Sequence, residues 1–241
     1  MFYGGMMGYY LDPTLIFVII GAVLSMAASA RVSSTYNKYS KVRSMSGMTG
    51  AEAAKRLLNS QGIYDVEVRQ VSGQLTDHYD PRSKTVNLSD SVYGSTSVAA
   101  IGVAAHECGH AMQHNTGYVP LRLRGAIVPV ANIGSQAAFP IILLGFFIGG
   151  VGSPLVNVGL ILFSLAVLFQ LVTLPVEFNA SRRAVDLLGQ VGILGTEELG
   201  HTRKVLGAAA LTYVAALAAT VLQLARLIFL FGGVGGRRND D

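Results

Sequence analysis

The chain has 241 residues, of which 51% are hydrophobic and only 13% are charged. A soluble domain carries about 25% charged residues, so this composition excludes an ordinary soluble protein and predicts that much of the chain lies in lipid. The formal net charge of +4 is explained by anionic lipid at a membrane surface, so no nucleic-acid partner is predicted.

The first apolar block, PTLIFVIIGAVLSMAASA at residues 13–30, is near the lower length limit for a membrane span of roughly 20 residues. A cleaved signal peptide would carry basic residues before its apolar core, but residues 1–12 contain no Lys or Arg. We therefore expect residues 1–30 to form a retained N-terminal transmembrane anchor. Basic residues follow from Arg31 on, so the positive-inside rule places residues 31–125 in the cytoplasm.

Residues 31–125 have an ordinary polar composition, and their local signals predict the order helix, strand, strand, helix. TGAEAAKRLLNSQG begins with Thr49 and Glu52 at capping-box spacing, so it should form a short helix that ends at Gly62. The valines of YDVEVRQVSG and the run TVNLSD predict two strands, with a turn at DPRSK between them. STSVAAIGVAAHECGHAMQH then predicts an alanine-rich helix that begins at serine caps.

This last helix contains the run HECGH, in which His106 and His110 lie one helical turn apart. Both imidazoles project from one face and can meet a single ion, and zinc suits their nitrogen ligands. Glu107 lies at the edge of that face, where it can take a proton from zinc-acidified water without ligating the metal. The predicted chemistry is hydroxide addition to a peptide carbonyl, with the proton returned to the leaving amine. Such residues are costly on an otherwise apolar helix without a use.

Two neighbours of this motif are predicted to stay outside the metal site. His114 lies about 12 Å along the helix from His106, whereas two zinc ligands lie roughly 3 Å apart, so it cannot join unless the helix breaks. Cys108 points to the opposite helix face and is expected to be a small buried packing residue. As the only cysteine, it excludes an internal disulfide and suits a reducing compartment.

Two further apolar blocks without charge, at 126–150 and 155–176, predict a two-span transmembrane hairpin over residues 126–176. Such a hairpin leaves and re-enters the membrane at one interface, so it should return Glu177, in LPVEFNASRRA, toward the histidines. A catalytic zinc site needs a third protein ligand, and we predict that Glu177 supplies it. The alternative is a carboxylate that is merely stabilised by the dipole of a helix start.

The remaining sequence divides into three parts. Residues 177–206 are polar again and are expected to form a cytoplasmic helix that carries the third zinc ligand. Residues 207–231 form a fourth apolar block, in which Gln223 and Arg226 leave open whether it spans the membrane or lies at its surface. Residues 232–241 are rich in glycine and then charged, and we expect a flexible tail.

The runs DHYDPRSKTVNLSDSVYGSTSVAAIGVAAHECGHAMQH, LPVEFNASRRA and AAALTYVAA resemble the YugP-type membrane zinc metallopeptidases, a bacterial family related in plan to the gluzincins of the HtpX and Ste24 kind. The resemblance implies a predominantly α-helical integral membrane protein with a small α+β gluzincin-like zinc peptidase domain. It implies one zinc ion held by His106, His110 and Glu177, with Glu107 as general base. We expect the bacterial inner membrane, with the active site at its cytoplasmic face.

The resemblance leaves three details open. HtpX-like enzymes place an aspartate four residues after the ligand glutamate to support a zinc histidine, but Ser181 stands there, so support must come from Ser181, Asn179 or elsewhere. A substrate-binding edge strand is expected beside the zinc helix, and KTVNLSD is the candidate. A group that stabilises the oxyanion is also expected, and the candidates are His201, Tyr213, Arg182 and Arg183.

The leading interpretation is a zinc endopeptidase that hydrolyses membrane-associated or misfolded proteins. The alternative is a zinc-stabilised membrane adaptor without turnover, against which the intact Glu107 argues, because a structural zinc site needs no base. A site-2-type intramembrane protease is disfavoured, because the motif begins only nine positions after Ser97, too few to place it deep in a span. The predicted partners are a protein or peptide substrate and the lipid bilayer; the sequence does not reveal an oligomer or a partner membrane protein.

Overall fold

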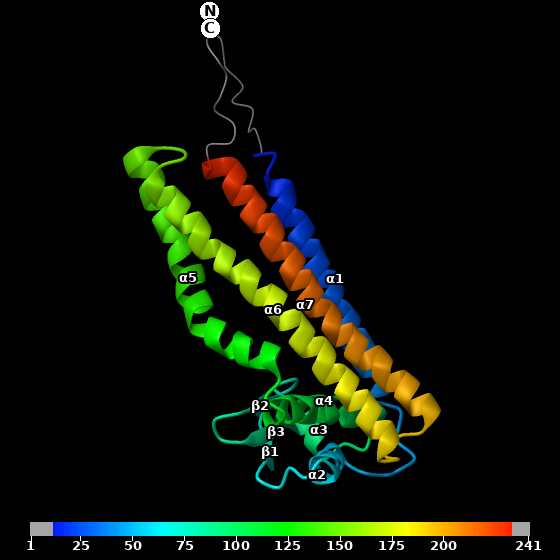
Figure 1. Cartoon of the computed structure of the whole chain (residues 1–241). Helices are drawn as coiled ribbons and strands as arrows, with labels where there is room; N and C mark the ends of the chain where they lie inside the picture. Colours follow the sequence, from blue (N-terminus) through cyan, green and yellow to red (C-terminus); the bar gives the residue numbers. More distant parts are fainter. Residues whose placement is uncertain (1–11, 233–241) are drawn as a thin grey trace, which may run out of the picture.

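The computed structural model describes residues 12–232. Four long helices form a bundle, and a small α+β domain lies at one end of it (Figure 1). The predicted fold class, a helical membrane protein with a small α+β domain, is confirmed. Residues 1–11 of the expected anchor and most of the expected tail, residues 233–241, lie outside the described residues.

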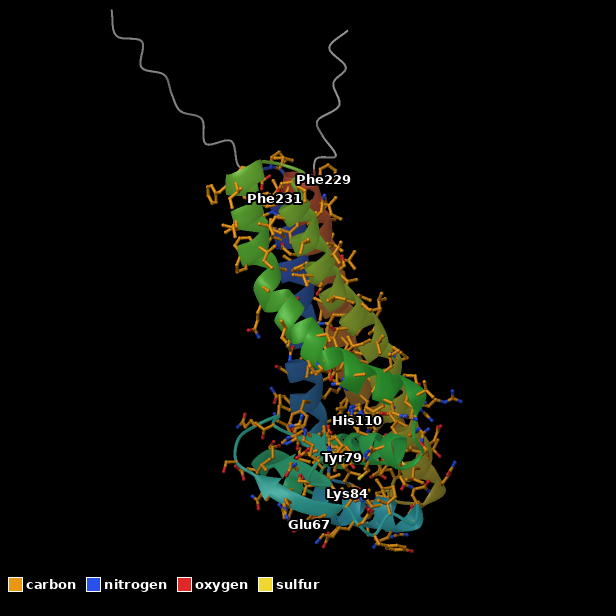
Figure 2. All side chains as sticks on the ribbon, turned by 60° about the vertical axis from the view of Figure 1, so that its left-hand side comes forward. Glu67, Tyr79, Lys84, His110, Phe229 and Phe231 are labelled. Atoms are coloured by element: carbon orange, nitrogen blue, oxygen red, sulfur yellow. The ribbon has the colours of Figure 1, made fainter. Side chains whose placement is uncertain are left out.

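The long helices are α1 (Leu15–Tyr39), α5 (Val119–Gly149), α6 (Pro154–Gln190) and α7 (Thr196–Phe231), and each is long and apolar enough to cross a membrane. Phe229 and Phe231 mark the end of the bundle that lies far from the α+β domain, while His110 lies within that domain at the opposite end (Figure 2). The fourth apolar block thus meets the same criteria as the other three. Arg226 does not prevent this, because its guanidinium lies 3.2 Å from the Asp12 carboxylate near the helix end.

The polar segment 177–206 does not form the separate helix that we expected. Residues 177–190 continue α6 without a break, and the chain turns at residues 191–195 before α7 begins. The third apolar block and Glu177 therefore share one continuous helix. The position of this carboxylate is therefore tied to the apolar helix that precedes it, in which Pro175 stands two residues before Glu177.

The α+β domain contains helices α2 (Gly50–Ser60), α3 (Asp90–Tyr93) and α4 (Val98–Asn115). Its sheet consists of β1 (Glu67–Val71), β2 (His78–Asp80) and β3 (Thr85–Ser89), in the order β1-β3-β2. β1 pairs with β3 in parallel and β2 pairs with β3 antiparallel. The expected capping box of α2 is present, because Thr49 and Glu52 each accept a hydrogen bond from the other's backbone N–H.

The prediction that KTVNLSD is an edge strand was wrong. It forms β3, which is buried along its whole length and has a neighbour on both sides. The strand at the edge near α4 is β2, which has only three residues. A strand of three residues shows no alternation of apolar and polar residues in a sequence. The longer run KTVNLSD was therefore predicted to be the edge strand instead.

Helix α4 runs through the core of the α+β domain, between α2, the sheet and the lower parts of α6 and α7 (Figure 1). Cys108 is fully buried on the face of α4 that meets α2, and its thiol contacts the carbonyl of Ala54 at 3.6 Å. Burial raises the pKa of the Cys108 thiol well above its ordinary value. The cysteine is therefore a packing residue, as its helix position predicted.

The backbones of α4 and α6 approach very closely at Gly109. A Cβ atom at this position would lie 2.5 Å from the carbonyl oxygen of Ala180, closer than real Cβ contacts come. Glycine is therefore required between His106 and His110 for a steric reason. Ala180 lies one turn after Glu177, so this contact sets how near the carboxylate comes to α4.

We expect Gly109→Ala to lower the free energy of unfolding in detergent by about 1–3 kcal/mol, because the methyl group pushes α6 away from α4. The same displacement should lower the zinc affinity of the purified protein. Gly200→Ala is the matched control, since a Cβ there meets nothing within 4 Å and alanine favours the helix. Unchanged unfolding and zinc binding in Gly109→Ala would contradict the steric role of this glycine.

Candidate metal centre

Helices α4 and α6 bring His106, His110 and Glu177 together. The ligand atoms of the three side chains all lie within 4.8 Å of one another. The Oε2 atom of Glu177 is 3.3 Å from Nε2 of His106 and 3.5 Å from Nε2 of His110. Two histidines from one helix thus meet a carboxylate that lies 67 positions after the second of them.

The donor set fits zinc. Glu177 is only 2% exposed, and its Oε2 atom is buried without a hydrogen-bond partner. An unsatisfied carboxylate oxygen is costly to bury, and a cation between it and the two imidazoles removes that cost. Two imidazole nitrogens with one glutamate oxygen form the ligand set of a known class of catalytic zinc sites.

The orientation of His110 is fixed by Gln113, which the sequence analysis missed. Gln113 is fully buried, and its amide nitrogen donates to the carbonyl of Val176 at 2.8 Å and to Asn179 Oδ1 at 3.0 Å. Its amide oxygen therefore faces His110 Nδ1, which lies 3.1 Å away and must be the donor. The lone pair of a neutral His110 ring is then on Nε2, the atom that faces Glu177, as metal binding requires.

His106 is supported by Ser181, whose hydroxyl lies 3.1 Å from His106 Nδ1. This serine stands at the position where the resemblance to HtpX-like enzymes had led us to look for an aspartate, and it contacts the histidine itself. Asn179, the other candidate, acts on the second histidine instead, by accepting the hydrogen bond from Gln113. Both residues that were left open therefore contribute, one to each imidazole.

Arg124 is a further residue that the sequence analysis did not single out. It lies near the start of α5, and its guanidinium donates a hydrogen bond to Glu177 Oε1 at 2.9 Å. This contact holds one carboxylate oxygen and leaves Oε2 directed at the imidazoles. The only sequence signal is a basic residue just before an apolar block, which equally marks membrane topology.

The electrostatics of the cluster favour positive charge. Burial alone would lower the pKa of His110, but the nearby carboxylates of Glu177 and Glu107 raise it above the ordinary value. A site that stabilises an imidazolium in this way is one that attracts a cation. The surrounding carboxylates and the arrangement of the side chains therefore both favour the binding of a cation.

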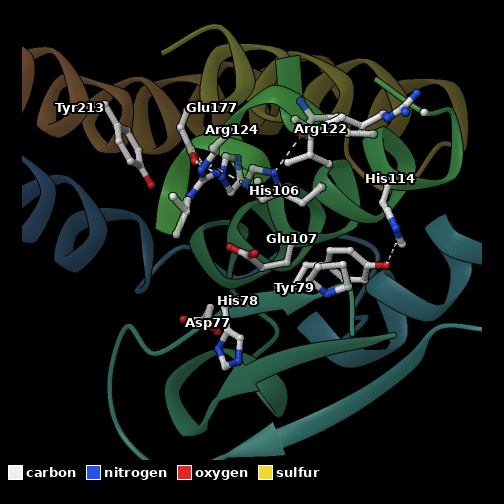
Figure 3. A pocket seen from close by; sticks show the side chains of 17 residues that line it. Asp77, His78, Tyr79, His106, Glu107, His114, Arg122, Arg124, Glu177 and Tyr213 are labelled. Atoms are coloured by element: carbon white, nitrogen blue, oxygen red, sulfur yellow. Dashed lines mark hydrogen bonds and ion pairs between the residues drawn. The ribbon is translucent and has the colours of Figure 1, made fainter. Parts of the chain in front are cut away.

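A cavity of about 840 Å³ opens beside the cluster. Glu107 is 8% exposed, and its carboxylate points into this cavity next to His106 (Figure 3). It is not among the grouped ligand atoms, which agrees with the expectation that it does not bind the metal. The wall opposite α4 includes His78 and Tyr79 of β2, so the edge strand of the sheet borders the cavity.

His114 lies outside the metal cluster, as helical rise predicted. Its Nδ1 atom is 2.9 Å from the hydroxyl of Tyr79, to which it is joined across the cavity wall (Figure 3). His114 thus connects α4 to β2 and has a structural partner of its own.

The structure separates the four candidates for oxyanion stabilisation. Tyr213 lines the cavity near Glu177 (Figure 3). The ring of His201 stacks on Tyr39 with centroids 4.7 Å apart. The arginines have other partners, since Arg182 pairs with Asp186 at 3.7 Å and Arg183 donates to Asn179 at 2.8 Å.

Two histidines of an HECGH helix that meet a buried glutamate of a second helix, beside another glutamate that faces a cavity, define a zinc metallopeptidase-type centre in a membrane protein. The family model described as "Putative neutral zinc metallopeptidase" matches residues 14–232, and the chain belongs to this family. The chain is also 49% identical over 217 residues to the "Putative membrane protease YugP" of Bacillus subtilis (strain 168), which covers 90% of this chain and 96% of that protein. No solved structure matches the chain.

These comparisons confirm the resemblance that the motifs indicated and the prediction of a zinc peptidase in a membrane. Zinc is the metal of the family, and the cluster formed by His106, His110 and Glu177 is able to hold it. The chain is therefore a multi-pass membrane protein of a zinc metallopeptidase family. The roles of the individual residues rest on the geometry alone.

We expect Gln113→Leu to weaken zinc binding about 10- to 100-fold, because His110 loses the acceptor that holds its ring and its tautomer. The measurement is competition with a chelator of known affinity, with the folded state checked by thermal unfolding. His114→Gln is the control, because His114 bonds Tyr79 and not a zinc ligand. Equal zinc affinity in Gln113→Leu and the wild type would refute this positioning role.

Proposed function

We propose that this protein is a zinc endopeptidase in which His106, His110 and Glu177 bind the metal and Glu107 is the general base. The observation that carries the proposal is the meeting of the three ligand atoms within 4.8 Å, with Glu107 directed into the adjoining cavity. A metal site with a purely structural role would be closed by a fourth protein ligand. The grouped ligands here number three, and the fourth side faces a cavity large enough for a peptide.

When bound, zinc supplies a Lewis acid that polarises a peptide carbonyl and lowers the pKa of water to about 7. Glu107 accepts the proton from the attacking water and returns it to the leaving amine. The hydroxyl of Tyr213, which borders the same cavity, donates to the oxygen on which negative charge develops. Arg124 and Gln113 hold Glu177 and His110 in place during these steps.

The substrate is an extended polypeptide segment. β2 is paired with β3 on one side, and its residues His78 and Tyr79 border the cavity on the other. An extended chain can add to such an edge through backbone hydrogen bonds, which do not depend on its side chains. This favours an unfolded or flexible segment over a folded domain, and it favours cleavage within a chain over removal of a terminal residue.

A smaller cavity of about 160 Å³ adjoins the metal cluster, and the apolar part of its lining comes largely from α7, through residues such as Val205, Leu206 and Ala209. It shares Glu107 and Tyr213 with the larger cavity. A dry apolar cavity of about 150 Å³ is large enough for a benzene ring. We infer that a leucine-sized or phenylalanine-sized side chain of the substrate enters it next to the cleaved bond.

We further propose the inner membrane of a bacterium, with the active site at the cytoplasmic face. Support comes from basic residues that flank the apolar parts of the helices at the end where the α+β domain lies, such as Arg31, Arg124 and Arg203. Positive residues are retained on the cytoplasmic side of membrane proteins. The metal centre lies at that same end of the bundle, beside the α+β domain (Figure 2).

We expect Glu107→Gln to abolish cleavage of an unstructured peptide library while keeping zinc, because glutamine cannot accept the proton. Glu177→Ala should instead lose the metal, since one of three ligands is removed. The measurements are metal content by elemental analysis and cleaved sites by mass spectrometry, in which apolar residues should adjoin the cut. Zinc-loaded wild type that cleaves no more than Glu107→Gln would favour the non-catalytic adaptor.

We expect Tyr213→Phe to reduce kcat about 10²- to 10³-fold with little change in KM, because it removes a donor that acts only in the transition state. Zinc content should remain that of the wild type, because the phenol is not a ligand. Arg182→Gln serves as the comparison, since Arg182 is exposed and pairs with Asp186. A kcat for Tyr213→Phe equal to that of Arg182→Gln would exclude Tyr213 from the reaction.

A further inference from the structure

A second hollow, separate from the metal centre, lies between α1 and α7 and has a volume of about 540 Å³. It shares no lining residue with the cavity that contains the zinc ligands. We call it the basic groove, because four of its lining residues are cations: Arg31, Lys38, Arg203 and Lys204. Its lining contains no acidic residue.

The four cations lack acidic partners. Within residues 12–232, none of them forms an ion pair with an aspartate or glutamate. The ammonium of Lys38 only approaches the ring of Tyr39, 5.5 Å from its centroid. Two pairs of like charges, one from each helix, repel each other in this arrangement. An anion between them turns that repulsion into attraction.

The groove lies where a bilayer places its headgroups. The apolar block of α1 ends at residue 30, and that of α7 begins at residue 207. The four cations therefore lie just outside the apolar part of each helix. Ser34 and Thr35 add hydroxyl donors among the cations, while Ala208 and Leu211 continue the lining on the apolar side. The lining therefore changes from charged to apolar in the direction of the membrane.

Gly207 borders open space in the groove. A Cβ atom at this position would meet nothing within 4 Å, so the space beside α7 is free. Farther along the pair, α1 and α7 are in tight contact, because a Cβ at Gly21 would lie 3.1 Å from the Cβ of Ala219. The hollow is thus a local opening in an otherwise close helix pair.

We propose that the basic groove binds the phosphate-bearing headgroup of an anionic phospholipid, with its acyl chains along Leu211 and the apolar surface of α7. The phosphate chemistry is shared with soluble phosphate esters. The apolar side of the lining and the position at the headgroup level favour the lipid. Basic pockets between transmembrane helices on the cytoplasmic side are suited to such headgroups. The bound lipid joins α1 to α7, the helix that also carries Tyr213.

The test uses the purified full-length chain in phosphatidylcholine mixed micelles, titrated with phosphatidylglycerol, and native mass spectrometry counts the bound lipid. We expect one phosphatidylglycerol to be retained at saturation. The double variant Arg203→Gln/Lys204→Gln should raise the apparent Kd about 25-fold, on the basis of about fivefold for each removed charge. Gly207→Ile, which fills the groove without changing the charge, should weaken binding to a similar extent.

Two controls separate this site from general attraction to negative charge. Lys55→Gln/Arg82→Gln removes two exposed cations outside the groove, and Gly200→Ile adds the same side chain to α7 at another open position. Both should bind the lipid as the wild type does. Equal loss in the charge control, or full binding by Gly207→Ile, would overturn the site. Displacement of the lipid by millimolar glycerol phosphate would overturn the choice of a lipid.

Discussion

The buried carboxylate of Glu177 is the constraint on which the arrangement of the other elements depends. A charged group that is 2% exposed requires partners, because an uncompensated buried charge costs several kcal/mol. Arg124 of α5 meets one oxygen, and the imidazoles of α4 face the other. Three helices must therefore dock at one point before this carboxylate can be buried. The cluster that can hold zinc therefore forms only when the membrane hairpin packs against the α+β domain.

Two features of α4 allow that docking. Gly109 lets the backbone of α6 approach, and Gln113 reaches across to the carbonyl of Val176 and to Asn179. The first contact is steric and the second is polar, so together they fix both the distance and the rotation of α6. Ser181 adds a third point of contact through His106. His106 is thus oriented directly by Ser181 of α6, and His110 indirectly, through Gln113 that α6 holds in place, so the geometry of the cluster depends on helix packing.

Local periodicity and chain direction were enough to predict which three side chains meet in the cluster that can hold a metal. Helical spacing identified His106 and His110 and excluded His114, and the hairpin implied that Glu177 returns to them. The same signals could not predict Gln113 or Arg124, because the partners of these residues depend on how α4, α5 and α6 cross. They also suggested a separate helix at 177–206, where the polar residues after Glu177 in fact continue α6. Polarity marked the exit from lipid, but no glycine or proline occurs after Glu177 until Gly189 to end the helix.

The unbroken course of α6 has a consequence for how the membrane acts on the site. A helix of 37 residues links the membrane hairpin to Glu177, although Pro175 removes one of its backbone hydrogen bonds two residues before that carboxylate. The position of Glu177 therefore depends on how α6 packs against α7 and α4, while His106 and His110 belong to a helix in the core of the α+β domain. The three grouped side chains are thus divided between a long apolar helix and the domain core. Without that apolar helix, α4 would lack the carboxylate of Glu177 beside its two histidines.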